Sequence, residues 1–161
     1  MTNVDFFEDF AADTTTVTSK NTEYYFEHSR EDFANLFDAE SEDDDQIKMF
    51  HYTTDINVKI NESGEVIGVT YTGEILALLK SDIDEVIHGQ KGIAREDSKY
   101  EKRVKALIED GGIIAEIVTY NNCNTERDYE LTFSGMKEIY NGPFDWNADG
   151  VFFTYELYIP V

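Results

Sequence analysis

Residues 49–71 read MFHYTTDINVKINESGEVIGVTY, and this stretch decides the fold. From Phe50 to Ile60, aromatic, β-branched and other apolar residues at even positions alternate with mostly polar residues at odd positions. A period of two predicts a long, half-buried strand, with His51 on its polar side. Residues 61–65 (NESGE) have the composition of a turn, so Val66–Tyr71 is predicted to be the second strand of a hairpin.

Apolar residues at helical spacing predict helices elsewhere in the chain. Gly89 would end one such segment and Gly111-Gly112 another, as glycines commonly do after a helix. For the segment that begins at Ile75, a strand over Ile75–Leu79 is the alternative. The predicted helices are a short one around Phe6, Phe7 and Phe10, one that begins near Ser29, one over 75–87 and one over 98–110.

Further strands are predicted around this hairpin. Residues 113–120 and 128–133, joined by a turn at 121–124, form a second hairpin, and residues 151–159 form the last strand. The Thr-rich residues 14–18 also favour a strand. The prediction is therefore a single α+β domain over residues 1–161, with a mostly antiparallel sheet of hairpins and two or three helices packed on one face.

The charge of the chain is its strongest functional signal. There are 34 Asp and Glu against 13 Lys and Arg, a formal net charge of −21 in 161 residues. Disordered acidic chains are poor in aromatic residues and rich in Pro, whereas this chain has 11 Phe, 10 Tyr and only 2 Pro. The acidity therefore belongs to a folded domain, which it destabilises by self-repulsion.

The first 50 residues are the most acidic part, with 14 acids and 3 bases. Dense runs of like charge are typical of solvated loops or interaction segments. We therefore predict that the densest run binds the partner, with nearby Tyr and Phe residues as anchors. The predicted partner-binding residues are Asp38, Glu40, Glu42, Asp43, Asp44 and Asp45.

Such a charge favours an inhibitor that presents carboxylates in place of nucleic-acid phosphates. A compact chain of this length is about 40 Å across, and a 34 Å turn of duplex DNA carries about 20 charges. The expected partner is a basic nucleic-acid-binding protein such as a nuclease. Phage and mobile-element counter-defence proteins, including anti-restriction and anti-CRISPR inhibitors, are similar in character. The alternatives are an immunity protein against a basic nuclease toxin and, for the charge alone, simple solubility.

A local motif adds an alternative of a different class, a calcium-binding module. Residues 145–156 match the spacing of an EF-hand loop, with oxygen-bearing residues at positions 1, 3, 5 and 12 and Gly150 at position 6. Pro143 and the strand-like residues after the motif favour a simple turn instead. The candidate calcium ligands are Asp145, Asn147, Asp149 and Glu156, and no other cofactor is expected.

No catalytic motif accompanies these features, so the chain is not expected to be an enzyme. The three histidines are scattered, and Cys123 has no base near it in sequence. A single cysteine and the absence of a signal-peptide pattern at the start predict a cytoplasmic protein, in the host cytoplasm if phage-encoded. We expect neither membrane insertion nor direct binding of nucleic acid, whose phosphates a −21 protein repels.

Overall fold

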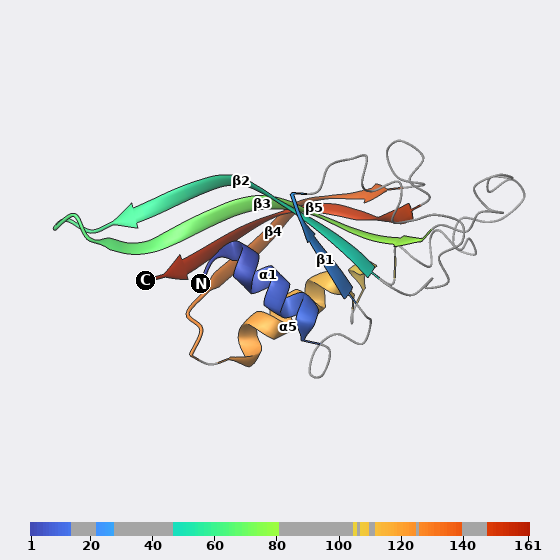
Figure 1. Ribbon diagram of the computed structural model, residues 1–161, viewed down its shortest axis with the longest axis horizontal. Coiled ribbons are helices and arrows are strands. Elements are labelled where there is room, and N and C mark those ends of the chain that lie inside the picture. Colours follow the sequence, from blue (N-terminus) through green and yellow to red (C-terminus); the bar gives the residue numbers. More distant parts are fainter. Residues whose placement is uncertain are drawn as a thin grey trace, which may run out of the picture.

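The predicted hairpin is present and forms the centre of the structure, with strand β2 at Ile47–Ile60 and strand β3 at Val66–Lys80. The remaining strands are β1 (Thr22–Phe26), β4 (Glu130–Ile139) and β5 (Ala148–Pro160) (Figure 1). The computed structural model describes residues 1–13, 22–27, 47–80, 105, 107–109, 112–124, 126–139 and 148–161.

These five strands form one sheet in the order β1-β2-β3-β5-β4. The pairs β2–β3, β3–β5 and β5–β4 are antiparallel, whereas β1 runs parallel to β2. The α+β class is therefore confirmed, and the sheet is mixed. Sequence reasoning did not identify β1, which is only five residues long.

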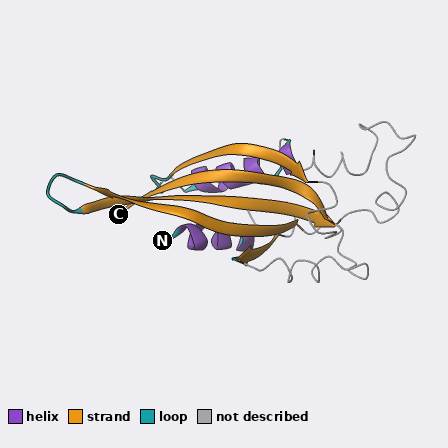
Figure 2. Cartoon of the chain, turned by 90° about the horizontal axis from the view of Figure 1, so that it is seen from above, coloured by secondary structure: helices purple, strands orange, loops and turns teal. Residues whose placement is uncertain are grey.

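Two helices, α1 (Asn3–Ala12) and α5 (Ile113–Cys123), lie on one side of the sheet, as Figures 1 and 2 show. We call this side the helix face and the opposite side the far face. Helix α1 begins with a capping box, in which Thr2 and Asp5 exchange hydrogen bonds between side chain and backbone. Neither of these helices is long and apolar enough to cross a membrane.

The main core lies between the two helices and the sheet. Helix α1 contributes its predicted phenylalanine stripe, and Phe6 and Phe10 both pack edge-on against Tyr120 of α5. A second, smaller buried cluster around Phe50 and Leu78 lies on the far face. Fully buried members of the main core include Phe6, Phe7, Phe10, Met49, Ile75, Ile117, Phe153, Tyr155 and Leu157.

One extra residue in β2 changes which side chains share a face. Thr53 is opposite Gly73, but Asp55 is opposite Thr72, so the register shifts at Thr54 as in a β-bulge. Residues directly opposite each other in an antiparallel pair point to the same face. The uninterrupted alternation predicted for residues 50–60 is therefore wrong: its apolar positions lie on the far face before the bulge and on the helix face after it.

The prediction of a helix over 75–87 is wrong for its first residues, and the strand alternative is confirmed. Residues 75–80 continue β3, with Ile75 and Ala77 in the main core and Leu76 and Leu78 in the far-face cluster. A strand buried on both faces reads as a continuous apolar run, which periodicity alone does not separate from a buried helix. Residues 81–87 lie outside the described residues.

The prediction of a strand over 113–120 is also wrong, because this segment is α5. Ile113, Ile117 and Tyr120 recur at the helical spacing i, i+4, i+7 and are all buried. Gly112 is the N-cap of this helix. The glycine pair predicted to end the preceding helix therefore also lies directly before the start of α5. The β-branched residues of the segment favoured a strand, and tertiary packing overrides that preference.

Some predicted elements lie wholly or mostly outside the described residues. These are the strand at 14–18, the helix that begins near Ser29 and most of the helix at 98–110. At the end of the last segment, residues 105, 107 and 108 are helical and Leu107 is buried.

We predict that Phe7 is the main contact through which α1 stabilises the sheet. Its fully buried ring packs edge-on against His51 (4.9 Å between centroids) and Tyr155 (4.7 Å). Phe7→Ala should lower the free energy of unfolding by about 3–5 kcal/mol, the usual cost of a deleted core phenylalanine. Denaturant titration measures the free energy of unfolding, with Val66→Ala as the control at an exposed position. Equally small losses of stability in the two variants would contradict the packing of Phe7 described above.

Candidate functional site

The acidic run predicted to bind the partner lies outside the described residues. This applies to Asp38, Glu40, Glu42, Asp43, Asp44 and Asp45, so their role stays a prediction. Of the aromatic anchors expected near this run, Phe50 is fully buried and stacks on Tyr25 (5.2 Å between centroids). Phe50 is therefore a core residue and is not available to a partner.

Two of the candidate calcium ligands, Asp149 and Glu156, lie in described residues, and the structure keeps these two apart. Asp149 and Glu156 are both in β5, seven residues apart, which is about 23 Å along an extended strand. Asp149 is buried on the helix face, opposite Leu79, whereas Glu156 is exposed on the far face. Calcium ligands lie about 2.3–2.6 Å from the ion, so these two residues cannot coordinate one ion. Asp145 and Asn147 lie outside the described residues.

Close packing between strands, and not the bend of a calcium loop, explains why residue 150 is glycine. It lies within β5, and a Cβ atom at this position would be 2.0 Å from the backbone oxygen of Ala77 on β3. The motif therefore includes a glycine that close strand packing requires. Over the residues that the structure describes, no group of three or more His, Cys, Asp and Glu side chains could hold a metal ion.

The far face carries a line of carboxylates that the sequence did not reveal. Strands β2, β3, β5 and β4 each contribute one acid, namely Asp55, Glu74, Glu156 and Glu130. We call these four residues the carboxylate line. Its members are brought together from four strands by the sheet register, and three of the four are exposed while Glu74 is half-buried.

The register fixes the order of the line. Asp55 and Glu156 are both opposite Thr72, and Glu74 is two residues further along β3. Glu130 is opposite Tyr158, two residues from Glu156. Each member is thus a diagonal neighbour of the next, at a separation of about 7–8 Å.

Small hydroxyl side chains separate these acids. Thr72 lies between Asp55 and Glu156 in one row across the sheet, and Thr132 continues that row on β4. No carboxylate of the line forms an ion pair with another residue of the described segments. The result is a polar surface across four strands whose negative charges are paired with no Lys or Arg of the described segments.

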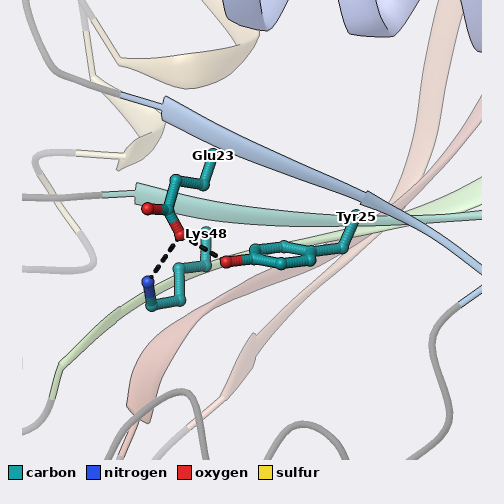
Figure 3. A network of polar contacts seen from close by, with 3 residues as sticks. All are labelled: Glu23, Tyr25 and Lys48. Carbon is teal, nitrogen blue, oxygen red and sulfur yellow. Dashed lines mark hydrogen bonds and ion pairs between the residues drawn. The ribbon is translucent and has the colours of Figure 1, made fainter.

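A second polar cluster on the far face is internally neutralised (Figure 3). Lys48 is 8% exposed, and its Nζ atom lies 2.9 Å from Oε2 of Glu23. The hydroxyl group of Tyr25 donates to the same carboxylate oxygen, and burial, followed by the bond to Glu23, raises the pKa of Tyr25. Because Lys48 is paired with Glu23, it does not compete with Lys or Arg side chains of a partner for the carboxylate line.

The prediction that His51 lies on the polar side of its strand is wrong, because His51 is fully buried on the helix face. Its Nδ1 atom is 2.6 Å from the hydroxyl of Tyr24, and its Nε2 atom is 2.5 Å from the hydroxyl of Tyr155. Asn3 of α1 donates from Nδ2 to Tyr155 and to the hydroxyl of Thr53, at 2.8 Å each. The network therefore ties α1 to three strands, and burial lowers the pKa of His51 to about 4.

The partners of His51 favour a structural role for it. Both ring nitrogens are engaged by phenols inside the core, and Phe7 of α1 packs on the ring. Neutral imidazole has one donor and one acceptor nitrogen, so one phenol donates to the ring and the other accepts from it. The exposed carboxylate line is therefore the better candidate functional site.

The sequence matches no protein-family model, and no curated protein is significantly similar to it.

The buried state of His51 predicts a specific pH dependence of stability. Its pKa falls from about 6.5 in the unfolded chain to about 4 in the folded protein. Between these values the unfolded state binds more protons, so this residue lowers the free energy of unfolding as the pH falls, by about 3 kcal/mol in total. Protonation of the many carboxylates has its own effect over the same range.

The His51 contribution is isolated by comparing the parent with His51→Gln, which keeps a hydrogen-bonding side chain. The parent should be the more stable protein at pH 7, and this advantage should shrink steadily towards pH 4. Denaturant titration at several pH values gives the difference. An advantage that is independent of pH would show that His51 does not change its protonation on unfolding.

We further predict that millimolar calcium leaves the melting temperature unchanged, because Asp149 and Glu156 cannot share an ion. A ligand that binds only the folded state raises the melting temperature with its concentration. Thermal melting of the parent and of Glu156→Gln, with and without calcium, tests this. A rise in the parent that disappears in the variant would restore the calcium-binding interpretation.

Proposed function

We propose that this chain is an acidic inhibitor that binds a basic, nucleic-acid-handling protein such as a nuclease. The carboxylate line on the far face takes the place of phosphates and meets Lys and Arg side chains of the partner. The single observation that carries this proposal is the arrangement of Asp55, Glu74, Glu156 and Glu130 across four adjacent strands. The chain acts by binding and blocking, with no catalysis of its own.

The spacing of the line supports mimicry of a nucleic-acid strand. Diagonal neighbours about 7–8 Å apart are separated by a distance similar to that between successive phosphates of one strand. Arg and Lys side chains that receive phosphates accept carboxylates with the same charge-assisted hydrogen bonds. Because the four acids come from a hydrogen-bonded sheet, their backbone positions are fixed before the partner arrives, which lowers the cost of binding.

The net charge of −21 supports the same proposal at longer range. A strongly negative surface accelerates association with a basic protein and orients it during the encounter. The predicted run from Asp38 to Asp45 would add to this steering. We propose that the protein acts in the cytoplasm, where a phage or mobile element would use it against a nucleic-acid-directed defence of the host.

The proposal predicts that removing the charges of the line weakens partner capture while the fold is retained. The test variant is Asp55→Asn, Glu74→Gln, Glu130→Gln and Glu156→Gln. The control neutralises four exposed acids elsewhere, Glu8→Gln, Asp9→Asn, Glu109→Gln and Glu126→Gln, so both variants have the same net charge. Exposed charges contribute little to stability, and Glu74→Gln keeps the size and shape of the one half-buried side chain, so both variants should stay folded.

Immobilised parent protein should capture basic nucleic-acid-binding proteins from a host lysate at low salt and release them at high salt, because exposed charge pairs are screened within about 8–10 Å. The line variant should lose most of this capture, and the control should retain it. Equal capture by both variants would move the interface away from the far face. Capture that is indifferent to salt, or that recovers only acidic proteins, would overturn the proposed function.

A further inference from the structure

The outer half of the β2–β3 hairpin carries apolar side chains that no described helix covers. Ile56, Val58, Ile60 and Val66 are 56%, 52%, 57% and 45% exposed. We call these four residues the hairpin patch. In Figures 1 and 2 the tip of the hairpin projects beyond α1 and beyond the end of β5, whose pairing with β3 ends at Pro160 opposite Gly68.

The register places the hairpin patch on the helix face. Ile56 is opposite Tyr71, which packs against the main core, and Val58 is opposite Val69. Ile60 and Val66 are opposite each other beyond a second register shift near the turn. The patch is therefore on the other side of the hairpin from Asp55 and the rest of the carboxylate line.

The apolar surface continues from the patch into a hollow of about 250 Å³. Val69 and Tyr71 line it from β3, Ile159 lines it from β5, and Tyr129 closes another side. Contiguous exposed apolar surface on a soluble protein usually marks an interaction site. A hollow beside exposed aliphatic side chains is suited to receive an apolar side chain of a binding partner.

The hairpin is already ordered at its tip. The side-chain oxygen of Asn61 accepts hydrogen bonds from the backbone N–H groups of Ser63 (2.9 Å) and Glu65 (3.0 Å). Gly64 has a φ of +82°, a left-handed conformation that suits glycine. An ordered hairpin loses little conformational entropy on binding. Less of the free energy gained by burying its apolar side chains is therefore offset, and more of it contributes to affinity.

Two features of β2 disfavour the addition of another strand at this edge. Strand β1 pairs with β2 only as far as His51, and the bulge at Thr54 follows. Beyond it, the backbone N–H of Ile56 donates to the side chain of Asp55 at 3.0 Å. Bulges and edge charges are devices that block strand addition, so the occupant binds the side chains of the patch and not its backbone.

The patch could be covered by a second copy of this chain or by a different protein, and charge distinguishes these two occupants. Glu62 and Glu65 lie in the turn next to Ile60 and Val66, and a second copy of the chain would bring another −21 charges to the patch. We infer that the hairpin patch docks on an apolar surface flanked by Lys and Arg on the same basic partner that meets the carboxylate line. This inference rests on the proposed function. The partner thus holds the projecting hairpin on both faces, with cations on one side and apolar contacts on the other.

The test uses two synthetic helical peptides of equal length and charge, one built from Leu and Lys and the other from Ser and Lys. The parent should bind the Leu/Lys peptide about tenfold more tightly, because only that peptide covers the patch. The variant Ile56→Thr with Val58→Thr keeps β-branched residues in the strand, and it should lose this preference while binding the Ser/Lys peptide as before. Met136→Thr, at another exposed apolar position on β4, is the control and should keep the preference.

The outcomes separate this inference from the proposed function. If the parent shows no preference, or the double variant retains it, the docking role of the patch is overturned, while salt-dependent binding of both peptides still supports the function. If neither peptide binds, both proposals are overturned. If sedimentation shows a dimer of the parent that the double variant abolishes, the patch belongs to a second copy and the inference is wrong.

Discussion

One extra residue in β2, at Thr54, determines which side chains the two faces of the hairpin present. Without the register shift, Ile56 and Val58 would continue the far-face row of Phe50, and the far face would be apolar along its length. With the shift, Asp55 lies on the far face beside Thr72, and the aliphatic side chains turn to the helix face. The carboxylate line and the hairpin patch both depend on this one local irregularity.

The rest of the structure supplies the rigidity that such a surface needs. A net charge of −21 opposes compaction, so the core must offset it with buried contacts. Phe6, Phe7 and Phe10 of α1 pack on the sheet, and Asn3 connects the helix to Thr53 and Tyr155 through hydrogen bonds. This anchoring lies on the helix face beside the bulge, so the anchoring of α1 and the carboxylate line are on opposite sides of one sheet.

Sequence patterns predicted the parts of the fold that local periodicity determines. The hairpin, the final strand and the phenylalanine face of α1 follow from spacings of two or of three to four residues. Periodicity failed where burial removed the alternation, at Ile75–Leu79, and where β-branched residues lie in a helix, at Ile113–Cys123. It also gave no sign of the bulge, because a one-residue shift depends on the pairing with β3. The carboxylate line was missed for the same reason, since its four members are separated by up to 101 positions in the sequence and meet only through strand register.

If the far face occupies the nucleic-acid site of a basic partner, the chain and nucleic acid must exclude each other from that partner. Competition between this chain and duplex DNA for the captured partner measures that exclusion most directly. We expect a DNA duplex to displace the chain completely at fixed salt, and the chain in excess to displace the duplex. Simultaneous binding of both, in a ternary complex that is stable at the same salt, would contradict this expectation.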